Sequence, residues 1–174
     1  MTPRTLLIAA ALCILFAIVA IQRVRAQAHV ESKSYDIMLS TLLAHSVPEI
    51  EVAKAAADTM AVFLDAREQP EYKVSHIPSA IWVGYDDFEL SRLEGVAKDT
   101  PVIVYCSVGY RSEKITEKLR QAGYANVSNL YGGIFEWVNR GHGVVNSENS
   151  ATNKVHAYSK SWGVWLEKGE KVYQ

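Results

Sequence analysis

The chain has 174 residues, which is enough for one domain with extensions. Its formal net charge is −1, so the chain has no excess of basic residues and no nucleic-acid partner is expected. Its two cysteines are Cys13, in an N-terminal apolar run, and Cys106, after a predicted strand. A domain separated from that run has a single thiol and no internal disulfide, which argues against a two-cysteine redox enzyme.

The N-terminal segment, residues 1–28, has three arginines, no acidic residue and an apolar run over residues 5–21. This pattern predicts a hydrophobic helix that serves as a signal peptide or a single membrane anchor. Residues 26–28 offer a cleavage site of small residues, but Arg23 and Arg25 disfavour cleavage there. We therefore expect a membrane-anchored domain facing the periplasm or exterior, with secretion after cleavage near Ala28 as the alternative.

Residues 29–46 are expected to form a tether followed by a helix over residues 34–45. Tyr35, Leu39 and Leu42 recur at helical spacing, so one face of this helix is apolar. That face is expected to pack on the domain that follows.

The central part, residues 47–144, alternates short apolar strands with helices. The strands are predicted over residues 47–52, 60–64, 81–83, 102–105 and 126–131. Helical segments separate them and close the domain at about residue 138. This alternation is typical of an α/β fold, a doubly wound parallel sheet of about five strands with helices on both faces.

The stretch after residues 102–105 carries the chemistry. A tight loop leads from this buried strand into a helix, and the backbone N–H groups of such a loop form a cradle for an anion. A cysteine held in this cradle is favoured as the thiolate, which is a nucleophile. We expect Cys106 to be catalytic, within a loop made of Cys106, Ser107, Val108, Gly109, Tyr110, Arg111 and Ser112. Ser112 is also expected to cap the helix.

Three motifs in order carry a resemblance to a known family. Residues 106–112 look like the active-site loop of the rhodanese family, whose members transfer sulfane sulfur through a cysteine persulfide. Residues 63–80, which include Asp65, Arg67 and His76, resemble the first signature of that family. Residues 130–141, which begin Leu-Tyr-Gly-Gly, resemble its closing signature. The resemblance covers one complete rhodanese domain.

The resemblance implies a sulfurtransferase that moves sulfane sulfur from thiosulfate, a polysulfide or a persulfide to a thiol or cyanide, with no cofactor and no metal. It places Asp65 and Arg67 near the catalytic loop, where Asp65 is expected to fix the turn and Arg67 to enter an internal ion pair. Arg111 is expected to orient the loop or the anionic end of the donor. Few basic residues surround the loop, so thiosulfate is expected to be a poor donor.

Two alternatives remain open. Related phosphatases and arsenate reductases have five residues between cysteine and arginine, whereas four lie between Cys106 and Arg111, so this activity is less favoured. A non-catalytic binding or sulfide-sensing module is the second alternative, although a scaffold has no need for the thiol.

The C-terminal extension, residues 145–174, lies beyond the resemblance. A polar stretch leads to an edge strand at residues 155–158, and Trp162, Trp165 and Leu166 then follow at helical spacing. Such large apolar side chains are costly to leave in water. We expect the extension to pack on the domain, with docking of a protein partner as the alternative.

Overall fold

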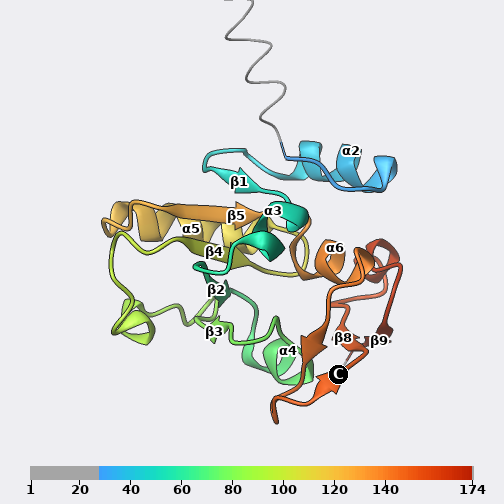
Figure 1. Ribbon diagram of the computed structural model, residues 1–174. Coiled ribbons are helices and arrows are strands. Elements are labelled where there is room, and N and C mark those ends of the chain that lie inside the picture. The colour runs from blue at the N-terminus through green and yellow to red at the C-terminus, as the bar shows by residue number, and fades with distance from the viewer. Residues whose placement is uncertain (1–27, 174) are drawn as a thin grey trace, which may run out of the picture.

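The computed structural model describes residues 28–173. A five-stranded sheet forms its centre, in the order β1-β5-β4-β2-β3, and every strand pair is parallel. The strands are β1 (Glu49–Ile50), β2 (Val62–Asp65), β3 (Ile81–Trp82), β4 (Val102–Tyr105) and β5 (Val127–Leu130). The predicted α/β parallel sheet of five strands is therefore confirmed (Figure 1).

Helices precede, connect and follow the strands of the sheet. They are α2 (Lys33–Leu42), α3 (Val52–Ala57), α4 (Gln69–Val74), the 3-10 helix η1 (Leu90–Leu93), α5 (Tyr110–Gln121) and α6 (Gly133–Asn139). Parallel strands need crossover connections of this kind, because a short hairpin turn can join only antiparallel strands. The helix predicted over residues 34–45 ends earlier, at Leu42.

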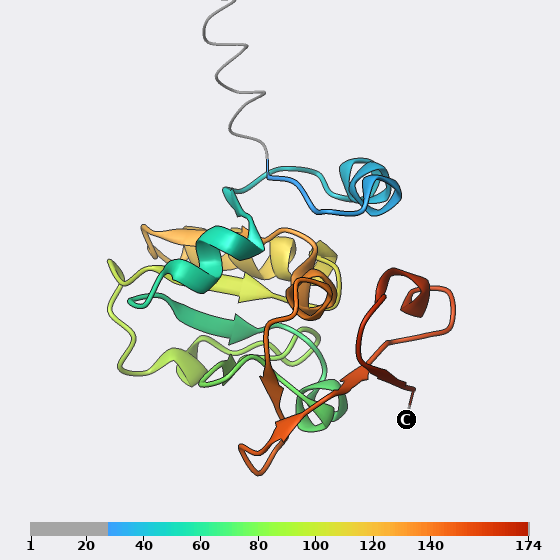
Figure 2. The ribbon, with the colours of Figure 1, turned by 45° about the vertical axis from the view of Figure 1, so that its right-hand side comes forward.

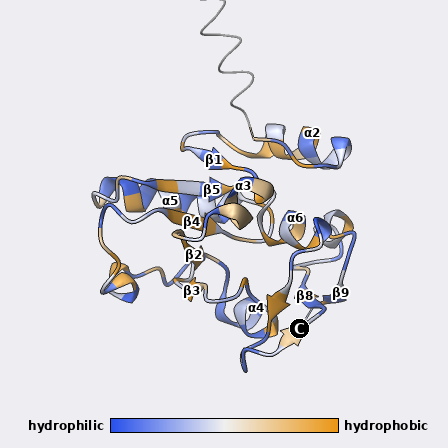
Figure 3. Cartoon of the chain, viewed as in Figure 1, coloured by the Kyte–Doolittle hydropathy of each residue, from blue (hydrophilic) through white to orange (hydrophobic). Residues whose placement is uncertain are grey.

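The sheet has an apolar core on each face because the side chains of each strand alternate between the faces. On one face, Ile103 and Tyr105 of β4 pack with Phe135 of α6. On the other, Val102 and Val104 pack with Leu119 of α5. All four residues of β4 are buried, which is typical of a central parallel strand. Figure 3 colours the chain by hydropathy in the view of Figure 1.

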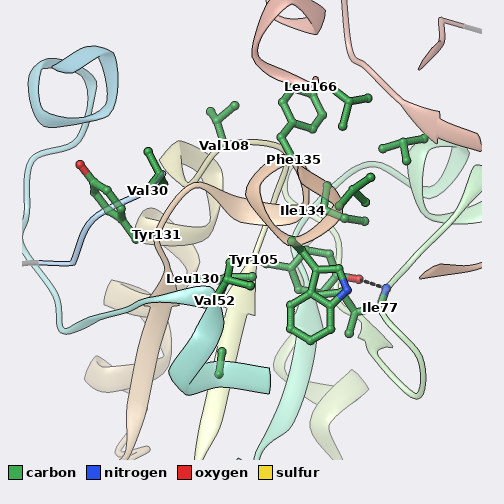
Figure 4. Packing of buried hydrophobic residues seen from close by; sticks show 14 of the residues in the cluster. Val30, Val52, Ile77, Tyr105, Val108, Leu130, Tyr131, Ile134, Phe135 and Leu166 are labelled. Atoms are coloured by element: carbon green, nitrogen blue, oxygen red, sulfur yellow. Dashed lines mark hydrogen bonds between the residues drawn. The ribbon is translucent and has the colours of Figure 1, made fainter. Parts of the chain in front are cut away.

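The C-terminal extension packs against the domain. It contains β6 (Val144–Val145) paired with β7 (Ala151–Thr152), β8 (Lys154–His156) paired with β9 (Glu170–Val172), and the 3-10 helix η2 (Gly163–Trp165). Leu166 is fully buried and lies beside Phe135 (Figure 4). The ring of Trp165 stacks on that of Tyr35 in α2 at 5.3 Å, so both extensions of the chain meet at the domain surface.

The predicted N-terminal hydrophobic helix, with its signal or anchor role, lies outside the described residues apart from Ala28. Across residues 28–173, no helix combines the length and apolar character that crossing a bilayer requires.

Candidate active site

Cys106 directly follows the central strand β4, at the carboxyl edge of the parallel sheet, where ligands bind in open α/β folds. Its side chain is 1% exposed and lines a pocket, so the thiol is enclosed but faces the pocket. The backbone N–H of Gly109 donates a hydrogen bond to Sγ at 3.1 Å. Gly109 reaches this position with φ at 123°, a backbone conformation that glycine adopts more readily than other residues.

The helix α5 begins immediately after Gly109, which occupies its N-cap position. The N–H groups of the first helical turn, Tyr110, Arg111 and Ser112, have no partner within the helix, and they carry the positive end of its dipole. Together with the Gly109 N–H they give this end of the pocket donors for an anion. The anion cradle over the whole loop stays a prediction, in which the Gly109 N–H is the amide that contacts Sγ.

The prediction that Ser112 caps helix α5 is wrong. Ser112 is the third residue of α5 and is fully buried, because the helix begins at Tyr110 rather than after the serine. Its hydroxyl donates to Asn129 Oδ1 at 2.7 Å, and the Asn129 amide donates to the Gly109 carbonyl at 3.1 Å. Asn129 of β5, which was not singled out from the sequence, therefore fixes the loop from the neighbouring strand.

Two loop carbonyls face α6. The Cys106 and Ser107 carbonyls accept hydrogen bonds from the Ile134 and Phe135 N–H groups at 2.9 and 3.1 Å. This contact requires glycine at position 133, since a Cβ there would lie 2.4 Å from the Cys106 carbonyl oxygen. The double glycine that opens α6 therefore lets that helix approach the cysteine loop and hold its carbonyls.

Arg111 is bound by Glu71 rather than left free for a substrate. Its Nη1 and Nη2 donate to the two Glu71 carboxylate oxygens at 2.6 and 2.8 Å, and Nη2 also donates to Ser107 Oγ at 3.0 Å. Arg111 was expected to orient either the loop or the anionic end of the donor. These contacts agree with the first role, because they connect α5 and the cysteine loop to α4.

Electrostatics keep this pair charged. Burial alone would raise the pKa of Glu71, but the hydrogen bonds and charge of Arg111, aided by Arg67, hold that pKa below its usual range. Burial opposes the charge of Arg111 as well, yet Glu71 and Cys106 raise its pKa above the usual value. Glu71 was not singled out from the sequence. It lies three residues after Glu68 and forms a capping box with it at the start of α4, and this spacing is the local signal that could have identified it.

Asp65 and Arg67 form an ion pair behind the loop. Both side chains are fully buried, and Arg67 Nη2 lies 2.6 Å from Asp65 Oδ2 and donates to the Ser75 carbonyl at 2.6 Å. The Arg67 N–H also donates to Asp65 Oδ1 at 3.0 Å, which closes the turn after β2. Neither residue lines the pocket, so they support the strand edge next to Tyr105 rather than the reacting atoms.

The pocket in front of Cys106 has a volume of about 580 Å³. Cys106, Ser107, Val108, Tyr110 and Arg111 of the loop contribute one side of it. The other residues come from α2, from the α4 and β3 connections, and from the C-terminal extension: Leu42, Glu68, Tyr85, Asp86, Tyr158 and Trp162. Within residues 28–173, no three His, Cys, Asp or Glu side chains are grouped so as to hold a metal ion.

The comparisons with known proteins agree with this fold. The Rhodanese-like domain family matches residues 49–140, and the chain belongs to this family. Solved structures share the fold. A Bacillus halodurans protein has a TM-score of 0.54 at 24% identity, and the match covers 66% of this chain and 85% of the Bacillus chain. The thiosulfate sulfurtransferase of Pseudomonas aeruginosa has a TM-score of 0.52 at 28% identity, and the match covers 69% of this chain and 23% of the Pseudomonas chain.

Among curated proteins, the chain is similar to enzymes named tRNA uridine(34) hydroxylase. The protein from Sodalis glossinidius is 35% identical over 102 residues, which are 55% of this chain and 29% of that protein. The protein from Erwinia tasmaniensis is 36% identical over 96 residues, which are 52% of this chain and 27% of that protein. The chain thus spans less than a third of the length of these relatives.

Proposed function

We propose that the protein is a sulfurtransferase that carries sulfane sulfur on Cys106 as a persulfide. The observation that carries the proposal is the setting of Cys106, which lies at the carboxyl end of the central strand, lines a pocket and accepts a hydrogen bond from the Gly109 N–H. The family membership supports the same chemistry. The donor is thiosulfate, a polysulfide or a persulfide, and the acceptor is a thiol or cyanide.

The reaction takes place in two displacements. The Cys106 thiolate attacks the sulfane sulfur of the donor, a sulfur–sulfur bond forms on Sγ, and the bond to the rest of the donor breaks. With thiosulfate the leaving group is sulfite, and with a persulfide it is the thiol. The acceptor then attacks the outer sulfur and restores the Cys106 thiolate. In each displacement the sulfane sulfur passes as a neutral atom, and the electron pair of the broken sulfur–sulfur bond stays with the leaving group, so no external oxidant or reductant is required.

The residues of the loop have separate roles in this scheme. The N–H groups of Gly109 and of the first turn of α5 stabilise the negative charge of the thiolate and the persulfide, a preorganised effect worth roughly several kcal/mol. Arg111 positions the loop through Glu71 and Ser107. A phosphatase or arsenate reductase is less favoured, because an arginine held in this way is not free to bind phosphoryl oxygens.

Mass spectrometry of the purified protein tests the proposal. After exposure to thiosulfate, a polysulfide or a thiol persulfide, we expect Cys106 to gain the mass of one sulfur atom, and the Cys106→Ser variant to gain none. Undiminished loading of that variant would overturn the proposal. Stable loading without transfer to any acceptor would instead favour the alternative, a binding or sulfide-sensing module.

Hydroxylation of tRNA, the activity in the names of the curated relatives, belongs to proteins more than three times the length of the matching segment. The net charge of −1 offers no support for a nucleic-acid partner here. We therefore do not extend that activity to this chain.

We also propose that residues 1–28 anchor the domain in a membrane so that it faces the periplasm or exterior, with secretion after cleavage near Ala28 as the alternative. The apolar run over residues 5–21 and the absence of acidic residues in the segment support this. Fractionation of cells that express the tagged full chain tests it. Protein confined to the cytosolic fraction would contradict both versions.

A further inference from the structure

The C-terminal extension reaches the cysteine pocket. After β8, which lies beside α4, the chain turns at Tyr158 with φ at 62° and continues to Trp162, and both side chains line the pocket. The Tyr158 ring lies 5.2 Å from the guanidinium carbon of Arg111. Figure 2 shows the extension standing beside α6 and α4, outside the parallel sheet. Part of the pocket wall therefore comes from a segment beyond the part of the chain that the family matches.

Most of the other wall residues are apolar or aromatic. Leu42 comes from α2, Tyr85 from the connection after β3, and Val108 and Tyr110 from the loop itself. A pocket of about 580 Å³ lies within the usual range for small organic ligands. It is far larger than a sulfur oxyanion, so it has space for an organic group next to the reacting sulfur.

The charges around the pocket disfavour an anion. Arg111 is the only cationic side chain among the described residues that line it, and Glu71, Ser107 and the Tyr158 ring already occupy the guanidinium. Two carboxylates, Glu68 and Asp86, also line the pocket. The amides near Cys106 can stabilise one negative charge on sulfur, but a donor with a second negative charge in the outer pocket meets no free cation there.

We propose that the physiological donor is an organic hydropersulfide with an uncharged, apolar group, and that Tyr158 and Trp162 of the C-terminal extension select it. This inference rests on the proposed sulfur transfer. The Cys106 thiolate bonds to the outer sulfur of the hydropersulfide, the bond between its two sulfurs breaks, and the organic thiol leaves with the proton. The apolar group lies against the two aromatic rings during this step.

Two matched donors test the selection. Benzyl hydropersulfide and its para-carboxybenzyl analogue carry the same reactive group and differ by one carboxylate away from it. Loading of Cys106 in the full chain is followed by mass spectrometry over time. We expect the uncharged donor to load about tenfold faster, the scale on which apolar pockets discriminate.

Variants of the extension separate selection from folding. Tyr158→Ala removes a side chain that is 53% exposed, and Trp162→Ala removes one that is partly buried. Each variant is expected to slow the loading of Cys106 by benzyl hydropersulfide about tenfold and to change the loading rate of the carboxybenzyl analogue little. The matched control is Val164→Ala, in the same segment but 60% exposed and outside the pocket, which should load both donors as the unaltered protein does.

A second pair of variants tests the charge argument. Asp86→Asn is expected to speed loading by the carboxybenzyl donor about twofold at low ionic strength, an effect that added salt removes. Glu89→Gln, on the same exposed connection but outside the pocket, should have no effect.

Three results would overturn the inference. Equal loading by the two donors in the unaltered protein would show that the pocket does not discriminate by charge. Equal slowing of both donors in Tyr158→Ala, with its melting temperature unchanged, would show that the extension does not select. Loading by neither these donors nor thiosulfate or polysulfide would overturn the sulfur-transfer proposal itself, and the inference with it.

Discussion

Glu71 and Arg111 are 40 residues apart in the sequence, yet they form an ion pair with two hydrogen bonds at the wall of the pocket. The Glu71 side chain is 4% exposed and that of Arg111 is 14% exposed. Removing one partner of such a pair leaves the other charge desolvated, which is more costly than the pair's own net stabilisation. The pair therefore contributes both to stability and to the position of the cysteine loop.

Glu71→Ala should consequently destabilise the protein by about 3 kcal/mol and slow persulfide formation on Cys106. Urea unfolding and mass spectrometry measure the two effects. The control is Glu170→Ala, because Glu170 and Lys154 form an exposed pair at 4.0 Å, and its loss should cost less than about 0.5 kcal/mol. Equal costs for the two variants would contradict the assigned role of Glu71.

Two histidines should affect the pH dependence of stability in opposite directions. Burial lowers the pKa of His156, and the charges of Arg67 and Arg111 add to this, although Glu71 opposes it at 3.9 Å. Burial opposes protonation of His45 too, but its hydrogen bond to Glu49 at 3.0 Å outweighs this and raises the pKa of His45. The folded protein thus resists protonation at His156 and favours it at His45.

The signs follow from linkage. Below the ordinary histidine pKa of about 6.5, the unfolded chain binds a proton at position 156 that the folded chain does not, so acidification destabilises the fold there. At His45 the folded chain holds its proton more tightly, and this stabilisation is present at acidic pH and is lost as pH rises through the raised pKa. His156→Gln should reduce the loss of stability between about pH 7 and about pH 5, and His45→Gln should increase it. Urea unfolding at several pH values measures how the free energy of unfolding of each variant changes with pH. If both variants changed the pH dependence of the unaltered protein in the same direction, the assignment would be contradicted.

At the scale of elements, the close approach of α6 to the cysteine loop depends on one residue. Gly133 has φ at 56°, and a Cβ there would meet backbone atoms of Cys106 and Ser107 at 2.4 to 2.7 Å. Backbone atoms cannot move aside as a flexible side chain can. The helix or the loop would have to shift, and the carbonyls of Cys106 and Ser107 would lose their partners.

Gly133→Ala is expected to lower the free energy of unfolding by about 3 kcal/mol and to abolish most persulfide loading. Gly141→Ala is the matched control, since Gly141 also has a positive φ of 85° but has open space around its Cβ position. That variant should lose only about 1 kcal/mol of unfolding free energy, because alanine is strained in the left-handed conformation. Its Cys106 should still be loaded with persulfide. Loss of loading in both variants would show that positive φ alone, rather than the approach of α6, is what matters.

The elements that the sequence predicted best are those with local signals. The apolar run Val102–Tyr105 became β4 with the expected bounds, and the Leu-Tyr-Gly-Gly motif lies at the end of β5 and the start of α6. The start of α5 was misplaced because Gly109, not Ser112, provides its N-cap. Glu71 with Arg111, and Tyr158 with the pocket, could not be foreseen, because no periodicity marks contacts between residues 40 or more positions apart.

At the scale of the whole molecule, the C-terminal extension shares the hydrophobic core. Val155, Ala157 and Leu166 are fully buried, and Trp165 stacks on Tyr35 of α2. We therefore expect the extension, α2 and the parallel sheet to unfold as one cooperative unit. Deleting the extension is expected to disturb the pocket and the core together, so point variants are the more informative test.

Leu166→Ala should destabilise the protein by about 3 kcal/mol, in the range for buried leucines. Val164→Ala, two residues earlier and 60% exposed, should change stability by less than about 0.5 kcal/mol. Thermal and urea unfolding should each show a single transition for both variants. A separate early transition in the unaltered protein would instead mean that the extension unfolds independently.

The central claim is that Cys106 carries the sulfur between donor and acceptor. It is tested most directly by loading the protein with polysulfide, removing the donor, and then adding cyanide. We predict thiocyanate in an amount equal to the loaded protein, loss of the added sulfur mass from Cys106, and no thiocyanate from Cys106→Ser. Thiocyanate that forms only while donor and cyanide are present together, or that forms equally with the variant, would contradict the persulfide mechanism.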